Sequence, residues 1–142
     1  MKLYHGSKDK FEKIERRQAM TDKSVQVPES ELQNKIYFTP DIGFALAMAV
    51  RPKGITHVDN GYISFENIDD FDPECTIYVY EIESESIEED LVEQVDNEQF
   101  AVDMDYVRPA VTHEFKAKDV FEYYELSEWV HPNEQESEFK FL

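Results

Sequence analysis

Residues 42–50 form an apolar stretch, Ile-Gly-Phe-Ala-Leu-Ala-Met-Ala-Val, with no polar face. Thr39 as N-cap, Pro40 at the first helical position and Asp41 in the first turn favour the start of a helix here. The helix is expected to end before Gly54. Because it is apolar nearly all round, other elements must cover it on several sides.

The segments on either side of this helix favour short strands. β-Branched and aromatic runs bounded by turn residues predict strands at residues 2–5, 35–39, 76–82, 99–102, 111–115 and 120–126. Between residues 55 and 65, Asn60-Gly61 separates two alternating runs and predicts a hairpin with a type I′ turn. Residues 28–34 predict one or two helical turns, and residues 86–91 predict a short helix capped by Ser86. Residues 7–19 fit either a helix or a loop. The pattern predicts an α+β domain.

The run at residues 76–82 alternates, so it predicts a strand with two different faces. One face carries Ile77, Val79 and Glu81, and the other carries Tyr78, Tyr80 and Ile82.

The length of 142 residues suits one domain with a core that needs no disulfide or metal. We expect a domain at residues 1–130 and a polar tail at 131–142. With Cys75 as the single cysteine, an intrachain disulfide is excluded, and Cys/His zinc patterns are absent. The four glycines match neither a phosphate loop nor a dinucleotide fingerprint. No metal is expected.

The charge is strongly negative and unevenly distributed. Fourteen Lys and Arg stand against 32 Asp and Glu, a net charge of −18, and residues 54–107 contain 17 acids and no Lys or Arg. A protein that binds nucleic-acid phosphates normally offers cations, so we expect no stable nucleic-acid binding. Two interpretations of this acidic block remain: solvated strand and loop faces, or a surface that mimics DNA or docks a basic partner.

The longest apolar run is too short to span a bilayer, and no charged-then-apolar leader precedes it. We therefore expect a soluble, cytoplasmic protein with no membrane partner.

Three short motifs carry candidate chemistry. In Tyr-His-Gly-Ser, residues 4–7, His5 leaves a predicted strand into a glycine turn. Tyr37 lies in the strand that leads into the alanine-bearing helix. Glu98, within Asn-Glu-Gln-Phe-Ala-Val, stands at the mouth of a late strand. In this order, over roughly residues 3–115, they resemble the His-Tyr-Glu branch of the ADP-ribosyltransferase superfamily, which includes the poly(ADP-ribose) polymerases, diphtheria-type toxins and rifampin ADP-ribosyltransferases.

The resemblance implies a fold in which two small, split antiparallel sheets form a cleft for NAD⁺. It implies an enzyme that breaks the nicotinamide–ribose bond and transfers ADP-ribose to an unknown acceptor, whether protein, nucleic acid, small molecule or water. That reaction passes through an oxocarbenium-like centre, which a carboxylate stabilises. By the resemblance, Glu98 is that carboxylate.

The same resemblance assigns the other site residues. His5 would hydrogen-bond the adenosine-side ribose. Gly6 would offer backbone groups to the nicotinamide amide, because a side chain there would block its approach, and Ser7 would add a hydroxyl to the same carboxamide. Tyr37 would stack on the nicotinamide ring. Many relatives place a second aromatic on the helix, and Phe44 is the nearest aromatic here.

The acid has an alternative position. Rifampin-type enzymes use an acid soon after the central strand, which here falls among Glu85, Glu88, Glu89 and Asp90. Glu98 is preferred because it enters a strand with alternating apolar residues, whereas these four lie on a segment expected to be solvated.

Two other functions remain open. A tRNA 2′-phosphotransferase of the same fold would need arginine pairs that grip phosphates, and the chain offers few arginines: Arg16, Arg17, Arg51 and Arg108. A non-catalytic interaction protein would use the acidic block as a DNA mimic or as an inhibitor of a basic partner. Release of nicotinamide from NAD⁺ distinguishes the enzyme from the interaction protein.

Overall fold

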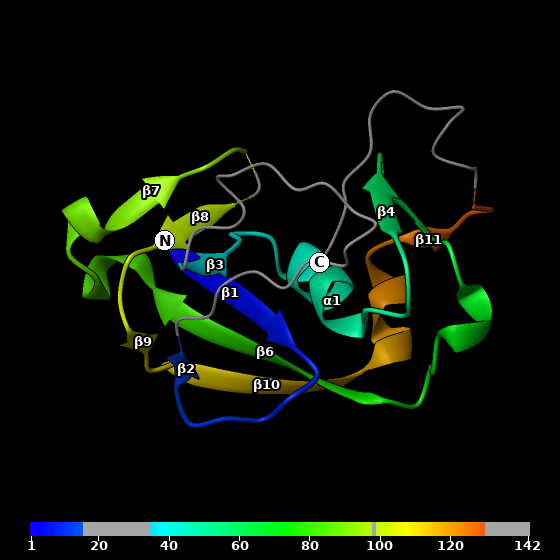
Figure 1. Cartoon of the computed structure of the whole chain (residues 1–142), viewed down its shortest axis with the longest axis horizontal. Helices are drawn as coiled ribbons and strands as arrows, with labels where there is room; N and C mark the ends of the chain where they lie inside the picture. Colours follow the sequence, from blue (N-terminus) through cyan, green and yellow to red (C-terminus); the bar gives the residue numbers. More distant parts are fainter. Residues whose placement is uncertain (16–34, 98, 130–142) are drawn as a thin grey trace.

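A computed structural model of the chain describes residues 1–15, 35–97 and 99–129 (Figure 1). The strands are β1 (Lys2–Ser7), β2 (Ile14–Glu15), β3 (Ile36–Phe38), β4 (Thr56–Asp59), β5 (Tyr62–Phe65), β6 (Thr76–Glu83), β7 (Val92–Gln94), β8 (Phe100–Val102), β9 (Tyr106–Val107), β10 (Val111–Lys116) and β11 (Glu125–Leu126). The α-helix is α1 (Ile42–Val50), and short 3₁₀ turns are η2 (Ile68–Asp70), η3 (Ser84–Ser86), η4 (Glu89–Leu91) and η5 (Ala117–Glu122). The α+β class predicted from the sequence is confirmed.

Two small antiparallel sheets form the centre of the molecule. One has the strand order β1-β6-β10 and the other β3-β8-β7. An isolated bridge joins them, in which Tyr4 and Thr39 exchange two backbone hydrogen bonds of 2.8 Å each. Figure 1 accordingly shows β7, β8, β3, β1, β6 and β10 following one another across the molecule. The two sheets are therefore neighbours along a single line of strands, and one residue pair bridges their backbones.

Two smaller sheets complete the strands. In the order β11-β5-β4, β4 and β5 form the predicted hairpin, and β11 adds to β5 in parallel. Asn60 and Gly61 have φ angles of 50° and 81°, as a type I′ turn requires. The fourth sheet pairs β2 with β9.

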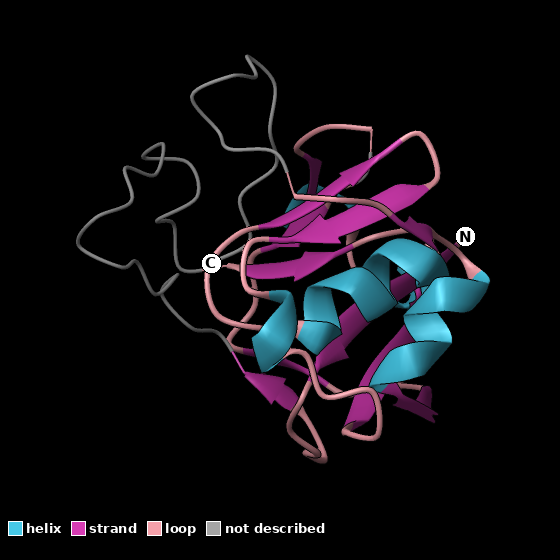
Figure 2. Cartoon of the chain, turned by 90° about the vertical axis from the view of Figure 1, so that its right-hand side faces the viewer, coloured by secondary structure: helices cyan, strands magenta, loops and turns pink. Residues whose placement is uncertain are grey.

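The central strand β6 has an apolar cluster on each face, as its alternation predicts. Ile77 and Val79 pack in the cluster that contains α1, the β4–β5 hairpin and η5. Tyr80 and Ile82 pack in the cluster that contains residues of β1, β3 and β8. Figure 2 shows the main helical segments gathered on one side of the strands. We call the first cluster the helix-side core and the second the sheet-side core.

Helix α1 begins two residues later than predicted. Asp41, not Thr39, is its N-cap: the Asp41 carboxylate accepts hydrogen bonds from the N–H groups of Gly43 (2.9 Å) and Phe44 (3.4 Å). Thr39 lies before the helix: its backbone pairs with Tyr4, its Oγ1 accepts from the N–H of Asp41, and Asp41 itself is still extended, with φ −103° and ψ 110°. The end at Val50 agrees with the prediction.

Two other predicted elements are wrong. Residues 86–91 do not form one capped helix, because the short turns η3 and η4 flank the buried Ile87. The run at 120–126 is not one strand: η5 occupies its first half, where Val120 is buried against α1 and neighbouring elements, and only Glu125–Leu126 pairs with β5. Apolar spacing alone did not separate a 3₁₀ turn from a strand.

Some predictions cannot be compared with the structure. The helical turns at 28–34 and the tail at 131–142 lie outside the described residues. Residues 8–13 form a loop that leads into β2, so the described part of the 7–19 segment is not helical. In the ranges that the structure describes, no helix is long and apolar enough to cross a bilayer.

Candidate functional site

Three of the predicted site residues, His5, Gly6 and Tyr37, lie beside the bridge between the two central sheets. If the antiparallel pairing of Tyr4 with Thr39 continued along both strands, Gly6 would lie opposite Tyr37. The ladder does not continue that far, since the Tyr4–Thr39 bridge is isolated. The last residues of β1 and the first residues of β3 therefore border a junction between the sheets.

His5 spans this junction. Its Nδ1 lies 2.8 Å from the backbone oxygen of Tyr37. Since a carbonyl oxygen only accepts, Nδ1 carries the hydrogen, and in the neutral ring Nε2 then has the lone pair. The half-buried imidazole also lies 5.8 Å from the ring of Phe38 and 6.4 Å from that of Tyr80, centroid to centroid. The structure thus brings the His5 side chain to the backbone of Tyr37.

Tyr37 directs its side chain away from the core that His5 touches. Its neighbours Ile36 and Phe38 are buried in the sheet-side core, so alternation directs the half-buried Tyr37 to the opposite face of β3. On β1, His5 follows Leu3 on the sheet-side face. A ligand that touches both side chains must therefore lie across the junction.

Gly6 has backbone groups that point into the junction. Tyr4 directs its N–H and C=O to Thr39, and groups two residues apart along a strand point the same way, so those of Gly6 are directed toward the β3 side. They are not part of the β1–β6 ladder, in which the groups of His5 and Ser7 point to β6.

The predicted glycine turn after His5 is wrong, because β1 continues through Gly6 to Ser7. The structure gives this glycine a packing role. A Cβ on Gly6 would lie 2.0 Å from the backbone oxygen of Ala45 in α1. The absence of a side chain is therefore required by the close approach of β1 and α1, and the expected blocking of a ligand is not needed to explain it. Ser7, next in the chain, accepts a hydrogen bond at Oγ from the N–H of Asp9 (3.1 Å).

Phe44 is 3% exposed and belongs to the interior of the molecule. It lies in the first turn of α1, where its N–H contacts the Asp41 cap. This burial favours a packing role over the predicted stacking on a ligand.

The candidate acids differ in what the structure describes. Glu98 lies outside the described residues, so its position relative to His5 stays a prediction. The residue after it, Gln99, accepts backbone hydrogen bonds from Val95 and Asp96 (2.9 and 3.4 Å) just before β8. β8 pairs with β3 so that Phe100 stands opposite Phe38.

The alternative acids are solvated. Glu85 is exposed and contacts the N-terminal ammonium, which lowers the pKa of its carboxyl. That places it at the opposite end of β1 from Ser7, since Lys2 pairs with Glu83. Glu88, Glu89 and Asp90 are exposed around η4.

Glu81 is a buried acid to which the sequence pattern assigns no role. Glu81, 8% exposed, accepts a hydrogen bond from Nε2 of His113 (2.9 Å) and lies 3.6 Å from the ammonium of Lys2. The His113 hydrogen bond is the largest cause that lowers the pKa of Glu81, although burial acts in the opposite direction. The alternation of residues 76–82 placed Glu81 on the same face as two apolar residues, and this indicated that it could be buried. No sequence pattern pointed to His113, which lies close to Glu81 because β10 pairs with β6.

Tyr80 is a second residue that the sequence did not single out. It is fully buried, and its hydroxyl donates to the backbone oxygen of Asp9 (2.7 Å) and accepts from the N–H of Phe11 (2.9 Å). Burial raises the pKa of this hydroxyl, so it remains protonated and able to donate.

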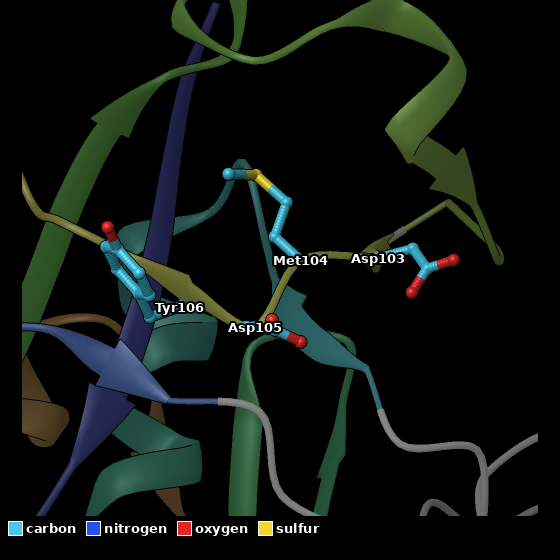
Figure 3. A pocket seen from close by; sticks show the side chains of 4 residues that line it. All are labelled: Asp103, Met104, Asp105 and Tyr106. Carbon is cyan, nitrogen blue, oxygen red and sulfur yellow. The ribbon is translucent and has the colours of Figure 1, made fainter.

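A surface hollow of about 420 Å³ lies on the loop between β8 and β9 (Figure 3). Its lining is Asp103, Met104, Asp105 and Tyr106, none of which is a predicted site residue. The Tyr106 ring already lies near the chain's own cations, 4.7 Å from the Lys13 ammonium and 5.6 Å from the Arg108 guanidinium. We assign the hollow no role in the candidate site.

Within the described residues, no group of three or more His, Cys, Asp or Glu side chains could hold a metal ion. Comparison with known proteins gives no relative: no family model, no curated protein and no solved structure matches this chain significantly.

Proposed function

We propose that this protein is an ADP-ribosyltransferase-like enzyme that cleaves the nicotinamide–ribose bond of NAD⁺ and transfers ADP-ribose to an acceptor or to water. The observation that carries the proposal is the hydrogen bond of 2.8 Å from His5 to the backbone of Tyr37. It brings two of the three motif residues, distant in sequence, to the one place where the two central sheets diverge. The proposal includes the split-sheet ADP-ribosyltransferase-type fold and a cytoplasmic location.

His5 has the form that its proposed role requires. With Nδ1 donating to Tyr37, Nε2 is the acceptor of the neutral ring. A ribose hydroxyl is a donor that such a nitrogen accepts. Contacts with Phe38 and Tyr80 hold the ring in place, which lowers the entropy cost of binding.

The nicotinamide end would lie on the other side of the junction. Gly6 directs an N–H donor and a C=O acceptor toward it, a pair that matches the carbonyl and amino groups of a carboxamide. Ser7 keeps an O–H to donate, since its oxygen accepts from Asp9. Tyr37, half-buried on this side, offers a ring for stacking worth about 0.5–1.5 kcal/mol beyond its area.

The reaction itself needs a carboxylate near the ribose. As nicotinamide leaves, positive charge develops on the ribose, and a fixed negative charge stabilises that state more than the ground state. Glu98 is the proposed acid because it stands two residues before β8, the strand that pairs with β3 next to Tyr37. The exposed Glu88 and Glu89 supply natural controls.

The test is release of nicotinamide from NAD⁺ by the purified full chain, with water and with a mixture of proteins as acceptors. Glu98→Gln keeps the shape and removes the charge, so turnover should fall about 10²–10³-fold while NAD⁺ still binds. Glu88→Gln and Glu89→Gln should leave turnover nearly unchanged. If either control loses turnover while Glu98→Gln stays active, the catalytic acid lies in the segment after β6 and is not Glu98.

Absence of both NAD⁺ turnover and NAD⁺-induced thermal stabilisation in the wild type would overturn the enzyme proposal. The acidic block at residues 54–107 would then become the leading evidence for a binding function. Its described carboxylates are exposed except for Glu81, so they would be available to a basic partner.

A further inference from the structure

The loop between β1 and β2 begins directly after the proposed nicotinamide-binding residues. It runs through residues 8–13, which contain no helix or strand. The hydrogen bonds described for its first half are those of Asp9 to Ser7, of Lys8 to Arg51, and the two that involve Tyr80. What holds this loop therefore decides where its side chains lie relative to His5.

The side chain of Tyr80 holds this loop in place. A phenolic hydroxyl buried without a partner costs free energy, so an apolar residue would be the simpler choice in the middle of β6. The Tyr80 hydroxyl makes two hydrogen bonds, one to the oxygen of Asp9 and one from the N–H of Phe11. Both partners are backbone groups of the loop, so the hydroxyl acts as a substitute for the ladder that the loop lacks.

The same side chain links the loop to the proposed site. The ring of Phe11 stacks on the Tyr80 ring at 4.8 Å and 16°. The imidazole of His5, the Cα partner of Tyr80 across the β1–β6 ladder, lies 6.4 Å away. Loop and histidine are thus held through one tyrosine.

The loop carries charges that NAD⁺ would require. Lys8 and Lys10 are exposed, and the ammonium of Lys8 lies 2.9 Å from the backbone oxygen of Arg51 at the end of α1. In a chain of net charge −18, whose residues 54–107 contain no Lys or Arg, an anionic pyrophosphate would be repelled from most of the surface. Lys8 and Lys10, on the loop that Tyr80 holds, are positive charges in that negative field.

We propose that Tyr80 is a positioning residue, which pins the Lys8–Lys10 loop beside His5 so that the loop forms the wall that receives the pyrophosphate of NAD⁺. This inference rests on the proposed function, because it assigns the loop to the same dinucleotide. Tyr80 itself need not touch the substrate, being fully buried.

The test compares Tyr80→Phe with Tyr78→Phe in the full chain. Both substitutions remove one hydroxyl from the same face of β6, but the hydroxyl of Tyr78 makes none of the hydrogen bonds that hold the loop. Tyr80→Phe keeps the ring that stacks on Phe11 and should fold. We measure amide hydrogen exchange of Phe11 without ligand, and KM and kcat for NAD⁺.

Tyr80→Phe should raise the exchange rate of the Phe11 amide and raise KM about 3- to 30-fold, the loss of one or two hydrogen bonds, with kcat changed less than twofold. Tyr78→Phe should change neither. A purely structural role would lower the melting temperature and leave KM unchanged, which would overturn the inference while NAD⁺ turnover by the wild type upholds the enzyme. Wild-type protein that neither binds nor cleaves NAD⁺ would overturn both.

Discussion

The two faces of β6 show how one strand serves two different cores. On the helix side, Ile77 and Val79 are fully buried against α1 and its neighbours, and the close contact of Gly6 with Ala45 leaves no room for a side chain. On the sheet side, Tyr80 is just as buried, yet its hydroxyl and the imidazole of His5 place polar groups among apolar ones.

The difference lies in what each face stabilises. The helix-side core contributes the usual gain from burying apolar area and fixes β1 against α1. In the sheet-side core, the polar groups of Tyr80 and His5 bond to backbone atoms of Asp9, Phe11 and Tyr37. Substitutions on the first face should therefore alter stability, and substitutions on the second should alter the candidate site as well.

The largest effect is expected from a cavity on the helix side. Ile77→Ala removes a fully buried side chain, so the free energy of unfolding should fall by about 2–5 kcal/mol. Urea unfolding measures it. If the folded fraction of this variant has an altered KM for NAD⁺, the separation of the two faces is wrong.

A clash on the helix side should have the next effect. Gly6→Ala would bring its Cβ within 2.0 Å of a backbone oxygen that cannot turn away, so we expect a loss of about 1–3 kcal/mol, at the upper end of that range. Gly61→Ala is the matched control. There the space is open and only the φ of 81° is unfavourable, which costs roughly 1 kcal/mol. Equal losses for the two variants would argue against the tight contact between β1 and α1.

On the sheet side, His5→Phe keeps a ring beside Phe38 and Tyr80 but removes the donor to Tyr37. Stability should fall by about 1 kcal/mol, and kcat/KM for NAD⁺ should fall by about tenfold or more. Calorimetry and nicotinamide release measure the two quantities. A variant with wild-type turnover would remove His5 from the site.

The smallest effect concerns Glu81, which faces Lys2 of β1 and His113 of β10. Its pKa in the folded state is lowered from the usual value of 4.5, so the pair adds stability that is present at neutral pH and lost as the pH falls below about 4.5. His113→Gln should therefore narrow the difference in melting temperature between pH 7 and pH 4. If the melting temperatures of variant and wild type depend on pH in the same way, the Glu81–His113 pair contributes nothing to stability.

The sequence predicted the structure correctly where neighbouring residues determine it. Asn60-Gly61 specified its hairpin because both residues accept positive φ, and the alternation in residues 76–82 specified both faces of β6. The start of α1 was misplaced because Thr39 is held by Tyr4, a partner far away in the chain. Sequence pattern could not weigh a local cap against a tertiary bridge.

The candidate site was predicted only in part for the same reason. The motifs pointed to His5 and Tyr37, which lie together, but the reason for Gly6 and the burial of Phe44 depend on how α1 packs. For Tyr80 the pattern predicted only an aromatic residue on one face of a strand. Its role depends on Asp9 and Phe11, which come from a loop whose structure the pattern left open.

The strand pairing of β1 has a consequence for the order of synthesis. All the partners of β1 are made after it: Thr39 first, and then β6, whose Glu83 stands opposite Lys2. A nascent chain emerging from the ribosome therefore carries β1 without its ladder partner until the whole of β6 has appeared. Such distant pairing is slow to form and leaves a strand edge open in the meantime. Assembly of the His5 region should thus be a late event, and a ribosome-bound chain stalled before residue 76 should leave His5 accessible to chemical modification.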